Sequence, residues 1–331
     1  MRLSVGIVGL PNVGKSTLFN ALLKKQQAYV ANFPFATIEP NIGVVPVPDP
    51  RLDKLAEVTK EEEKMASFPP EVPATVEFVD IAGLIEGASK GEGLGNKFLS
   101  HIRQVDAICF VLRAFSDPDV IKQGVKDPKS DFDILKLELQ LSDEDMVTEH
   151  SKKKNADVGS LPLLSKKPFL IVLNVDEQDL KEASGLEEKY SKELGVEKDQ
   201  VVVISAKTES ELSELSDGDQ SAYLKDLGVE KSGLERLIQK AFATLGLITF
   251  LTAGEKEVRA WTITNGINAV EASGVIHTDF MKKFIKADVV EFNDFIENGG
   301  WKVCRELGKV RTEGRDYIMK DGEVVEFKIG Q

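Results

Sequence analysis

The sequence predicts an α/β protein in which a mostly parallel sheet carries helices on both faces and a smaller α+β domain follows. Its 331 residues suit two domains of about 150 residues each. Short runs rich in Val and Ile alternate with helical stretches, and such alternation produces right-handed βαβ units with strands buried on both faces. We expect strands of the first domain at Leu3–Val8, Thr75–Asp80, Ala107–Leu112, Phe169–Val175 and Val201–Ser205.

The pattern changes near residue 248, so we place the first domain at 1–247 and the second at 248–331. In the second domain, Asp316–Met319 and Val324–Ile329 flank the turn-forming residues 320–322, which is a hairpin signature. Further strands are expected at Val258–Thr264 and Phe284–Phe292, with helices at 267–273 and 301–308.

Residues 117–168 permit two interpretations. Phe132, Leu135 and Leu139 share one helical face, whereas part of the same run alternates between apolar and polar residues as a strand would. We favour a helix, followed by an exposed loop at 152–160.

Composition narrows the class of protein. With 42% apolar and 29% charged residues the chain is of ordinary globular type, which excludes a disordered or fibrous protein. No apolar run reaches the ~18 residues of a membrane span, and the first residues lack a signal pattern, so we expect a cytoplasmic protein. Cys109 and Cys304 lie too far apart for a zinc site or a disulfide framework. The net charge of −13, concentrated in 177–226, repels phosphate backbones over much of the surface.

The strongest motif is G-x-x-x-x-G-K-[ST] at residues 9–17, directly after a predicted strand and before a helix at 16–24. Its glycines allow a tight loop whose N–H groups point at a phosphate, and the helix start adds a partial positive charge. We assign Lys15 to the β- and γ-phosphates and the Ser16 hydroxyl to Mg²⁺. The nucleotide-binding residues of this loop are then Asn12, Val13, Gly14, Lys15, Ser16 and Thr17.

A second motif, D-x-x-G, begins at Asp80 at the end of a predicted buried strand. An acid at that position faces the crevice where such sheets bind ligands, and it can hold Mg²⁺ through water. Gly83 can bring its N–H to the γ-phosphate, which gives it a catalytic role beside Lys15. Thr37 lies between the two motifs and is expected to offer a second hydroxyl to Mg²⁺. The predicted metal ligands are therefore Ser16, Thr37 and Asp80.

Two later motifs predict where the base binds, namely Asn174-Val175-Asp176-Glu177 and Ser205-Ala206-Lys207. Guanine-nucleotide proteins carry N-K-x-D and S-A-K at these places, and the Asp accepts two hydrogen bonds from the guanine edge. Here Val replaces the Lys and Glu replaces the Asp, so we expect ATP to bind at least as well as GTP. The predicted base-binding residues are Asn174, Glu177, Ser205, Ala206 and Lys207.

These motifs, with the fragment 261–263 and the run 315–322, resemble the Obg-like ATPase family of the YchF type over nearly the whole chain. The resemblance implies a P-loop NTPase domain of the G type that hydrolyses ATP. It also implies ribosome binding, at the large subunit or at the subunit interface, by a monomer. Residues 248–331 resemble the TGS module, a ubiquitin-like β-grasp fold.

The chain departs from this family in ways that affect the mechanism. Family members usually insert a long helical arm where 117–168 leaves room for one helix and a loop, and they often carry a His where this chain has residues 121–123. Leu84 stands where Ras-like proteins place a water-orienting Gln. Slow hydrolysis remains possible through Lys15, Mg²⁺ and the loop N–H groups. In related P-loops an Asn at the position of Asn12 helps to hold K⁺, which would make it catalytic, although it equally suits a role in stabilising the loop.

The sequence is therefore compatible with three functions. The first is an ATP-hydrolysing switch that binds the ribosome, the second a non-catalytic nucleotide-dependent ribosome or RNA-binding protein, and the third a GTPase of the same family.

Basic residues gather at 301–315 in this otherwise acidic chain. On a helix Lys302, Arg305 and Lys309 would share one face. We interpret this stripe as a candidate contact with RNA or the ribosome, with a merely solvated face as the alternative.

Overall fold

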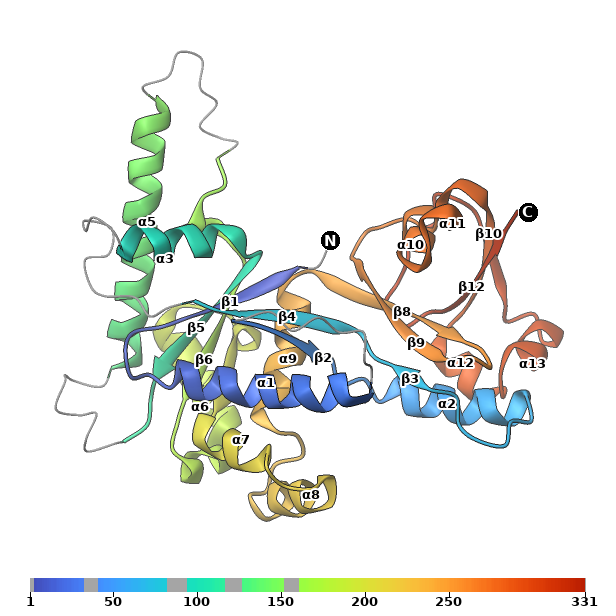
Figure 1. Ribbon diagram of the computed structural model, residues 1–331, viewed down its shortest axis with the longest axis horizontal. Helices are drawn as coiled ribbons and strands as arrows, with labels where there is room; N and C mark the ends of the chain where they lie inside the picture. Colours follow the sequence, from blue (N-terminus) through green and yellow to red (C-terminus); the bar gives the residue numbers. More distant parts are fainter. Residues whose placement is uncertain (1–2, 33–40, 82–93, 117–126, 152–160, 331) are drawn as a thin grey trace. The chain divides into compact units, whose positions relative to one another are not determined.

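The computed structural model describes residues 3–32, 41–81, 94–116, 127–151 and 161–330 (Figure 1). Contacts divide the chain into two compact units, Met1–Val45 with Val76–Leu245, and Pro46–Thr75 with Gly246–Gln331. We expected residues 46–75 in the first domain, but they belong to the second unit. The reason is that β3 (Glu71–Val72) pairs with β9 (Val258–Thr264), while α2 (Arg51–Glu62) packs against the same strand.

The first unit is built on a six-stranded sheet of order β2-β4-β1-β5-β6-β7. Strand β1 pairs in parallel with β4 and β5, and the parallel ladder continues through β6 to β7. The five predicted strands are confirmed to within two residues, whereas β2 was not predicted. The bounds are β1 Ser4–Val8, β2 Ile42–Pro46, β4 Thr75–Asp80, β5 Ala107–Arg113, β6 Phe169–Asn174 and β7 Val201–Ile204.

Helices cover both faces of this sheet, with α1 on the opposite side from α3 in Figure 1. The α-helices are α1 Lys15–Asn32, α3 Leu94–Gln104, α5 Pro128–Ser151, α6 Ala183–Leu194, α7 Ala206–Leu212, α8 Asp217–Asp226 and α9 Gly233–Thr244. Short 3-10 helices lie at η2 Leu164–Lys166, η3 Glu177–Glu182 and η4 Lys198–Gln200.

The helix predicted within the insertion is confirmed as α5. Phe132, Leu135 and Leu139 are buried on one side of it, in a core shared with β5 and β6, while Leu137 is exposed. The helical interpretation is correct because an apolar face repeating every three to four residues meets the sheet. The loop predicted at 152–160 lies outside the described residues.

The second unit has a mixed sheet of order β11-β10-β12-β8-β9-β3, with helices α2 and α10 to α13 beside it. Neighbouring strands pair antiparallel except β12 with β8 and β3 with β9, which pair in parallel, so the predicted α+β character is confirmed. The remaining bounds are β8 Leu247–Ala253, α10 Ala269–Ile276, α11 Thr278–Lys283, β10 Phe284–Val290, α12 Phe292–Glu297, α13 Trp301–Glu306, β11 Arg311–Glu313 and β12 Val324–Ile329.

The hairpin predicted around residues 320–322 is wrong. Ile318 forms only an isolated bridge with Asn268, and β12 pairs with β10 and β8 instead. The turn is fastened to β8, because Gly322 N donates to Thr249 O at 2.7 Å and Asp321 accepts from Thr249 N at 2.9 Å. A turn signature predicts that the chain reverses its direction. It does not predict which strand the turn lies beside. The strands β8 and β11 were not predicted, and β10 ends at Val290, before the expected Phe292.

Candidate nucleotide-binding site

The loop at residues 9–17 joins the end of β1 to the start of α1, as predicted. Gly14 has φ +96°, and a Cβ at this position would lie 2.2 Å from the Asn174 amide nitrogen. A Cβ on Gly9 would lie 2.6 Å from the carbonyl oxygen of Val111. Both glycines are therefore required by close approach of the loop to β5 and β6, in addition to any contact with phosphate.

Lys15 and Asp80 form a pair of opposite charges beside this loop. The Lys15 side chain is only 9% exposed, and its Nζ donates to the Leu10 carbonyl at 3.3 Å. Burial lowers the pKa of Lys15 even though Asp80 favours the charged amine. Burial likewise raises the pKa of Asp80, which ends β4, against the opposing effect of Lys15. Each charge is thus incompletely compensated within the protein alone.

These residues fit a bound Mg²⁺–triphosphate. A phosphate would stabilise the Lys15 ammonium and a cation would stabilise the Asp80 carboxylate. Among the described residues, no three His, Cys, Asp or Glu side chains gather as a metal site. That agrees with the way Mg²⁺ binds in such sites, through one carboxylate or hydroxyl together with substrate phosphates and water. Ser16 is exposed at the start of α1 and could serve as that hydroxyl.

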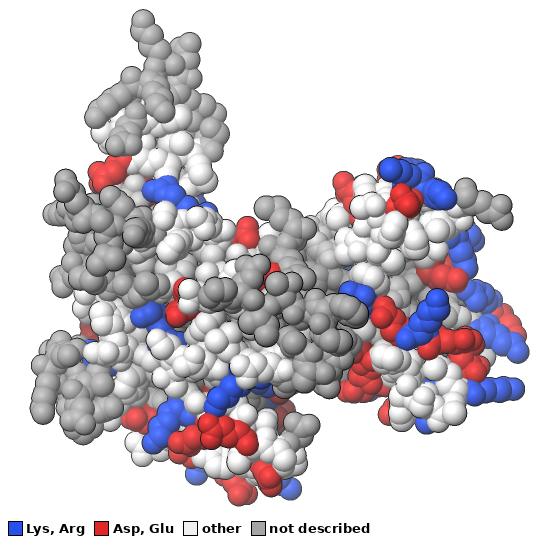
Figure 2. Space-filling view, in the orientation of Figure 1, with Lys and Arg blue, Asp and Glu red and all other residues white. Residues whose placement is uncertain are grey.

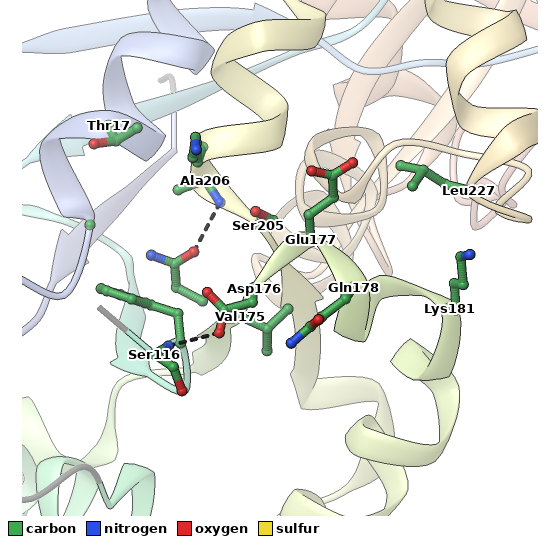
Figure 3. A pocket seen from close by; sticks show the side chains of 14 residues that line it. Thr17, Ser116, Val175, Asp176, Glu177, Gln178, Lys181, Ser205, Ala206 and Leu227 are labelled. Carbon is green, nitrogen blue, oxygen red and sulfur yellow. Dashed lines mark hydrogen bonds between the residues drawn. The ribbon is translucent and has the colours of Figure 1, made fainter. Parts of the chain in front are cut away.

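A cavity of about 840 Å³ opens beside the loop (Figure 3). This volume lies within the range of small-molecule sites, about 300–1,000 Å³. It receives residues from the carboxyl ends of β5, β6 and β7, where open α/β sheets bind their ligands. Its lining comprises Gly14, Thr17, Phe115, Ser116, Asn174, Val175, Asp176, Glu177, Gln178, Lys181, Ser205, Ala206, Lys207 and Leu227.

Asn174 ties the two predicted motifs together at the base of the cavity. Its amide nitrogen donates to Val13 O at 2.9 Å, and its side-chain oxygen accepts from Ala206 N at 2.9 Å. The side chain is 6% exposed, so both bonds are shielded from water. Ser205 is buried as well and caps α7, since its Oγ accepts from Thr208 N at 3.4 Å. Asn174 and Ser205 therefore shape the cavity, whereas Lys207 is exposed at its wall.

Glu177 and Asp176 bring two carboxylates to the cavity, and each has a partner. Glu177 accepts a hydrogen bond from the Tyr223 hydroxyl at 2.6 Å, and Asp176 accepts one from Ser116 N at 2.8 Å. Val175 is 3% exposed and packs into the core, so it offers the base only a small part of its surface.

Several of the lining residues were not predicted from the sequence. Phe115, Ser116 and Asp176 follow β5 and β6, and the rule that ligands bind at the carboxyl ends of parallel strands could have found them. Leu227 follows α8, for which the sequence carries no motif, and Tyr223 of α8 contacts the lining residue Glu177.

Two predicted site residues, Thr37 and Gly83, lie outside the described residues, as do Leu84 and the segment 121–123. Their roles stay predictions.

The basic stripe does not form as predicted. Helix α13 ends at Glu306 because Gly308 adopts φ +68° and Lys309 N bonds back to Cys304 O, so Lys309 lies beyond the helix. The Arg305 guanidinium is 2.6 Å from the Glu326 carboxylate, and the Lys309 ammonium is 3.1 Å from Asp294. Figure 2 shows basic and acidic side chains interspersed on the visible face of the second unit.

The phosphate loop, the acid at the end of β4 and the cavity at the strand ends define a P-loop nucleotide-binding protein. The family model described as "50S ribosome-binding GTPase" matches residues 4–175. A second model, for the C-terminal domain of YchF GTPases and described as a protein of unknown function, matches residues 247–330.

Full-length relatives narrow the class further. The Ribosome-binding ATPase YchF of Bacillus subtilis is 43% identical, with 99% of each chain covered. The protein of the same name from Escherichia coli O157:H7 is 42% identical, again with 99% of each chain covered. The solved structure of the Schizosaccharomyces pombe YchF GTPase is 34% identical, has a TM-score of 0.83, and covers 99% of this chain and 98% of its own. The chain belongs to the YchF family of P-loop NTPases, which generally use Mg²⁺.

Proposed function

We propose that this protein is a ribosome-associated, Mg²⁺-dependent ATPase that hydrolyses ATP to ADP and phosphate as a conformational switch in the cytoplasm. The observation that carries the proposal is the phosphate loop with its buried Lys15, which opens into a cavity where Glu177 takes the place of the guanine-reading Asp. The names of the full-length relatives, Ribosome-binding ATPase, support the same conclusion.

In the proposed mechanism, Lys15 and the loop N–H groups stabilise the negative charge on the transferred phosphoryl group. Ser16, Thr37 and Asp80 would hold Mg²⁺, and Asn12 would help to hold K⁺. Mg²⁺ would supply additional positive charge next to the phosphates. Gly83 would donate its N–H to the γ-phosphate.

The base would occupy the cavity between Asn174, Glu177 and the segment Ser205–Lys207. Glu177 is one methylene longer than the Asp of guanine-binding proteins, so it is not positioned to accept both donors of the guanine edge. ATP would then bind at least as well as GTP.

The proposed partner is the ribosome, at the large subunit or the subunit interface, bound by a monomer. Lys302 is exposed on α13 and could contact RNA directly, whereas Arg305 and Lys309 would first have to leave their carboxylate partners. The alignment with the Bacillus subtilis relative spans 371 positions against the 331 residues of this chain, in keeping with a shortened insertion at 117–168. The second unit, as a TGS domain, would carry more of the contact.

Steady-state phosphate release from ATP, compared between the wild type and Lys15→Ala, tests the enzymatic part. We expect release from the wild type and loss of at least about 100-fold in the variant, because one phosphate-binding cation is worth several kcal/mol in a shielded site. Equal release from both would leave ATP as a ligand only, and the non-catalytic alternative would be correct. Co-sedimentation of the wild type with ribosomes in ATP and in ADP tests the partner, and we expect different amounts bound in the two states.

A further inference from the structure

Tyr223 contacts Glu177, a lining residue of the base cavity, and no motif accounts for this contact. It lies near the end of α8, and its hydroxyl donates to Oε1 of Glu177 at 2.6 Å. Glu177 is the first residue of η3, directly after β6, so the bond joins segments 46 residues apart in the sequence. A hydrogen bond to an ionised carboxylate is short and about twice as strong as one between neutral groups.

This bond restricts what the carboxylate can do for a base. The guanine edge presents two adjacent donors, N1–H and the 2-amino group, and a carboxylate reads both by using its two oxygens. Adenine presents one donor group, the 6-amino group, beside an acceptor nitrogen. With one lone pair of Oε1 taken by Tyr223, Oε2 is the oxygen that keeps its full acceptor capacity. That suffices for the one donor group of adenine, whereas the second donor of guanine must share Oε1 with the phenol.

The neighbours of Glu177 also favour selection against guanine. One oxygen of the neighbouring Asp176 carboxylate is likewise shared, because it accepts from Ser116 N at 2.8 Å. The bond to Glu177 raises the pKa of Tyr223 to about 12, and the phenol therefore remains a donor at every physiological pH.

We propose that Tyr223 is a positioning residue for nucleotide selection, which occupies one oxygen of Glu177 and thereby disfavours guanine. The inference rests on the proposed function, because it concerns how the same cavity distinguishes ATP from GTP. In this proposal Tyr223 acts only through Glu177.

The test is the ratio of the Kd for GTP to the Kd for ATP, measured by calorimetry with the full chain in Mg²⁺. In Tyr223→Phe we expect GTP to bind more tightly and the ratio to fall by about five- to tenfold, the net size expected for one ordinary hydrogen bond. Tyr190→Phe is the matched control, since Tyr190 lies on α6 and is not the tyrosine that donates to Glu177. It should leave the ratio unchanged.

A second pair of variants separates a selective role from a structural one. In the Glu177→Gln background, the further change Tyr223→Phe should no longer alter the ratio, because the carboxylate through which Tyr223 acts is gone. If Tyr223→Phe weakens both nucleotides equally, or leaves the ratio unchanged in the wild-type background, the inference is wrong while the ATPase proposal stands. If the wild type itself fails to bind ATP, the proposed function fails first.

Discussion

The charged residues beside the phosphate loop of the first unit differ from the ion pairs of Arg311 and Arg51 in the second unit. In the second unit, Arg311 contacts Glu323 at 2.5 Å and Glu291 at 2.8 Å, and Arg51 bridges Asp49 and Asp321. In the first unit, burial shifts the pKa of Lys15 down and the pKa of Asp80 up, so each is pushed towards its neutral form. Arg311 and Arg51 thus find their partners within the fold, whereas Lys15 and Asp80 are incompletely compensated within the protein, as charges at ligand-binding sites often are.

The largest effect should follow from removing the cationic partner of a buried carboxylate in the second unit with Arg311→Met. Glu323 is fully buried, and without Arg311 its charge would keep only the Tyr317 hydroxyl and Lys320 N as partners. We expect a loss of about 3 kcal/mol in unfolding free energy. Both tryptophans of the chain, Trp261 and Trp301, belong to this unit, so urea unfolding followed by tryptophan fluorescence reports on it directly.

The double variant Arg311→Met with Glu323→Gln is the control, since it removes both charges. It should recover at least half of the loss, because a neutral side chain costs less to bury. An Arg311→Met variant as stable as the wild type would remove the contrast between the two units.

The next largest effect is expected at Asn174→Ala in the first unit. The change leaves Val13 O and Ala206 N without their buried partner, which costs about 1–3 kcal/mol. Because these bonds fix the phosphate loop against the segment after β7, ATP affinity measured by calorimetry should fall about tenfold. The tryptophan transition of the second unit should not move, and a shift there with unchanged ATP affinity would contradict the division between the units.

Asp80→Asn should stabilise the nucleotide-free protein at neutral pH. Because the pKa of Asp80 is raised in the folded state, the folded state binds the proton more tightly than the unfolded chain does. The resulting advantage is complete below the ordinary pKa of Asp and is lost as the pH rises through the folded pKa. Asn stays neutral throughout, so the variant should match the wild type near pH 4 and gain on the order of 2 °C in Tm at pH 7.

Calorimetric scans of Asp80→Asn between these pH values, with the exposed Asp226→Asn as a control, check the prediction. Asp80→Asn should also lose the Mg²⁺ dependence of ATP binding. A Tm below that of the wild type at pH 7 would show that Asp80 serves the fold, as the charges of the second unit do.

The smallest effect is expected from reversing Lys302, Arg305 and Lys309 to Glu. Two of the three already face carboxylates, and exposed pairs of this kind contribute about 0–1 kcal/mol each. Co-sedimentation with ribosomes across a salt series should show a loss of about two- to threefold with a slightly flatter salt dependence. A loss of tenfold or more would mean that these cations leave their partners to bind phosphate, and that the second unit also holds charge ready for a ligand.

The sequence predicted the nucleotide site better than it predicted the second unit. The loop 9–17 and the pair Asn174 and Ser205 act locally, since a fixed spacing places them at strand ends. The turn 320–322 failed because its outcome depends on a distant partner, whereas the stripe 301–309 failed at a local helix-ending glycine that the sequence already contained. Thr249 fastens the turn, and Gly308 ends the helix before the third cation of the stripe.

Tyr223 illustrates the same limit within the nucleotide site. Its partner Glu177 belongs to a recognisable motif, yet nothing in the spacing of α8 indicates that its tyrosine reaches that carboxylate. Residues 46–75 likewise join the second unit through pairing of β3 with β9, a contact that no local pattern contains.

The central claim is that the site formed by Lys15, Asp80 and the cavity binds an adenine nucleotide. Competition on the wild-type protein tests this claim most directly. Labelled ATP is bound in the presence of Mg²⁺ and displaced with unlabelled ATP or unlabelled GTP. We predict that GTP displaces the label no better than ATP does. Tighter binding of GTP by tenfold or more, about 1.4 kcal/mol, would contradict the account of Glu177 and of the cavity built around it.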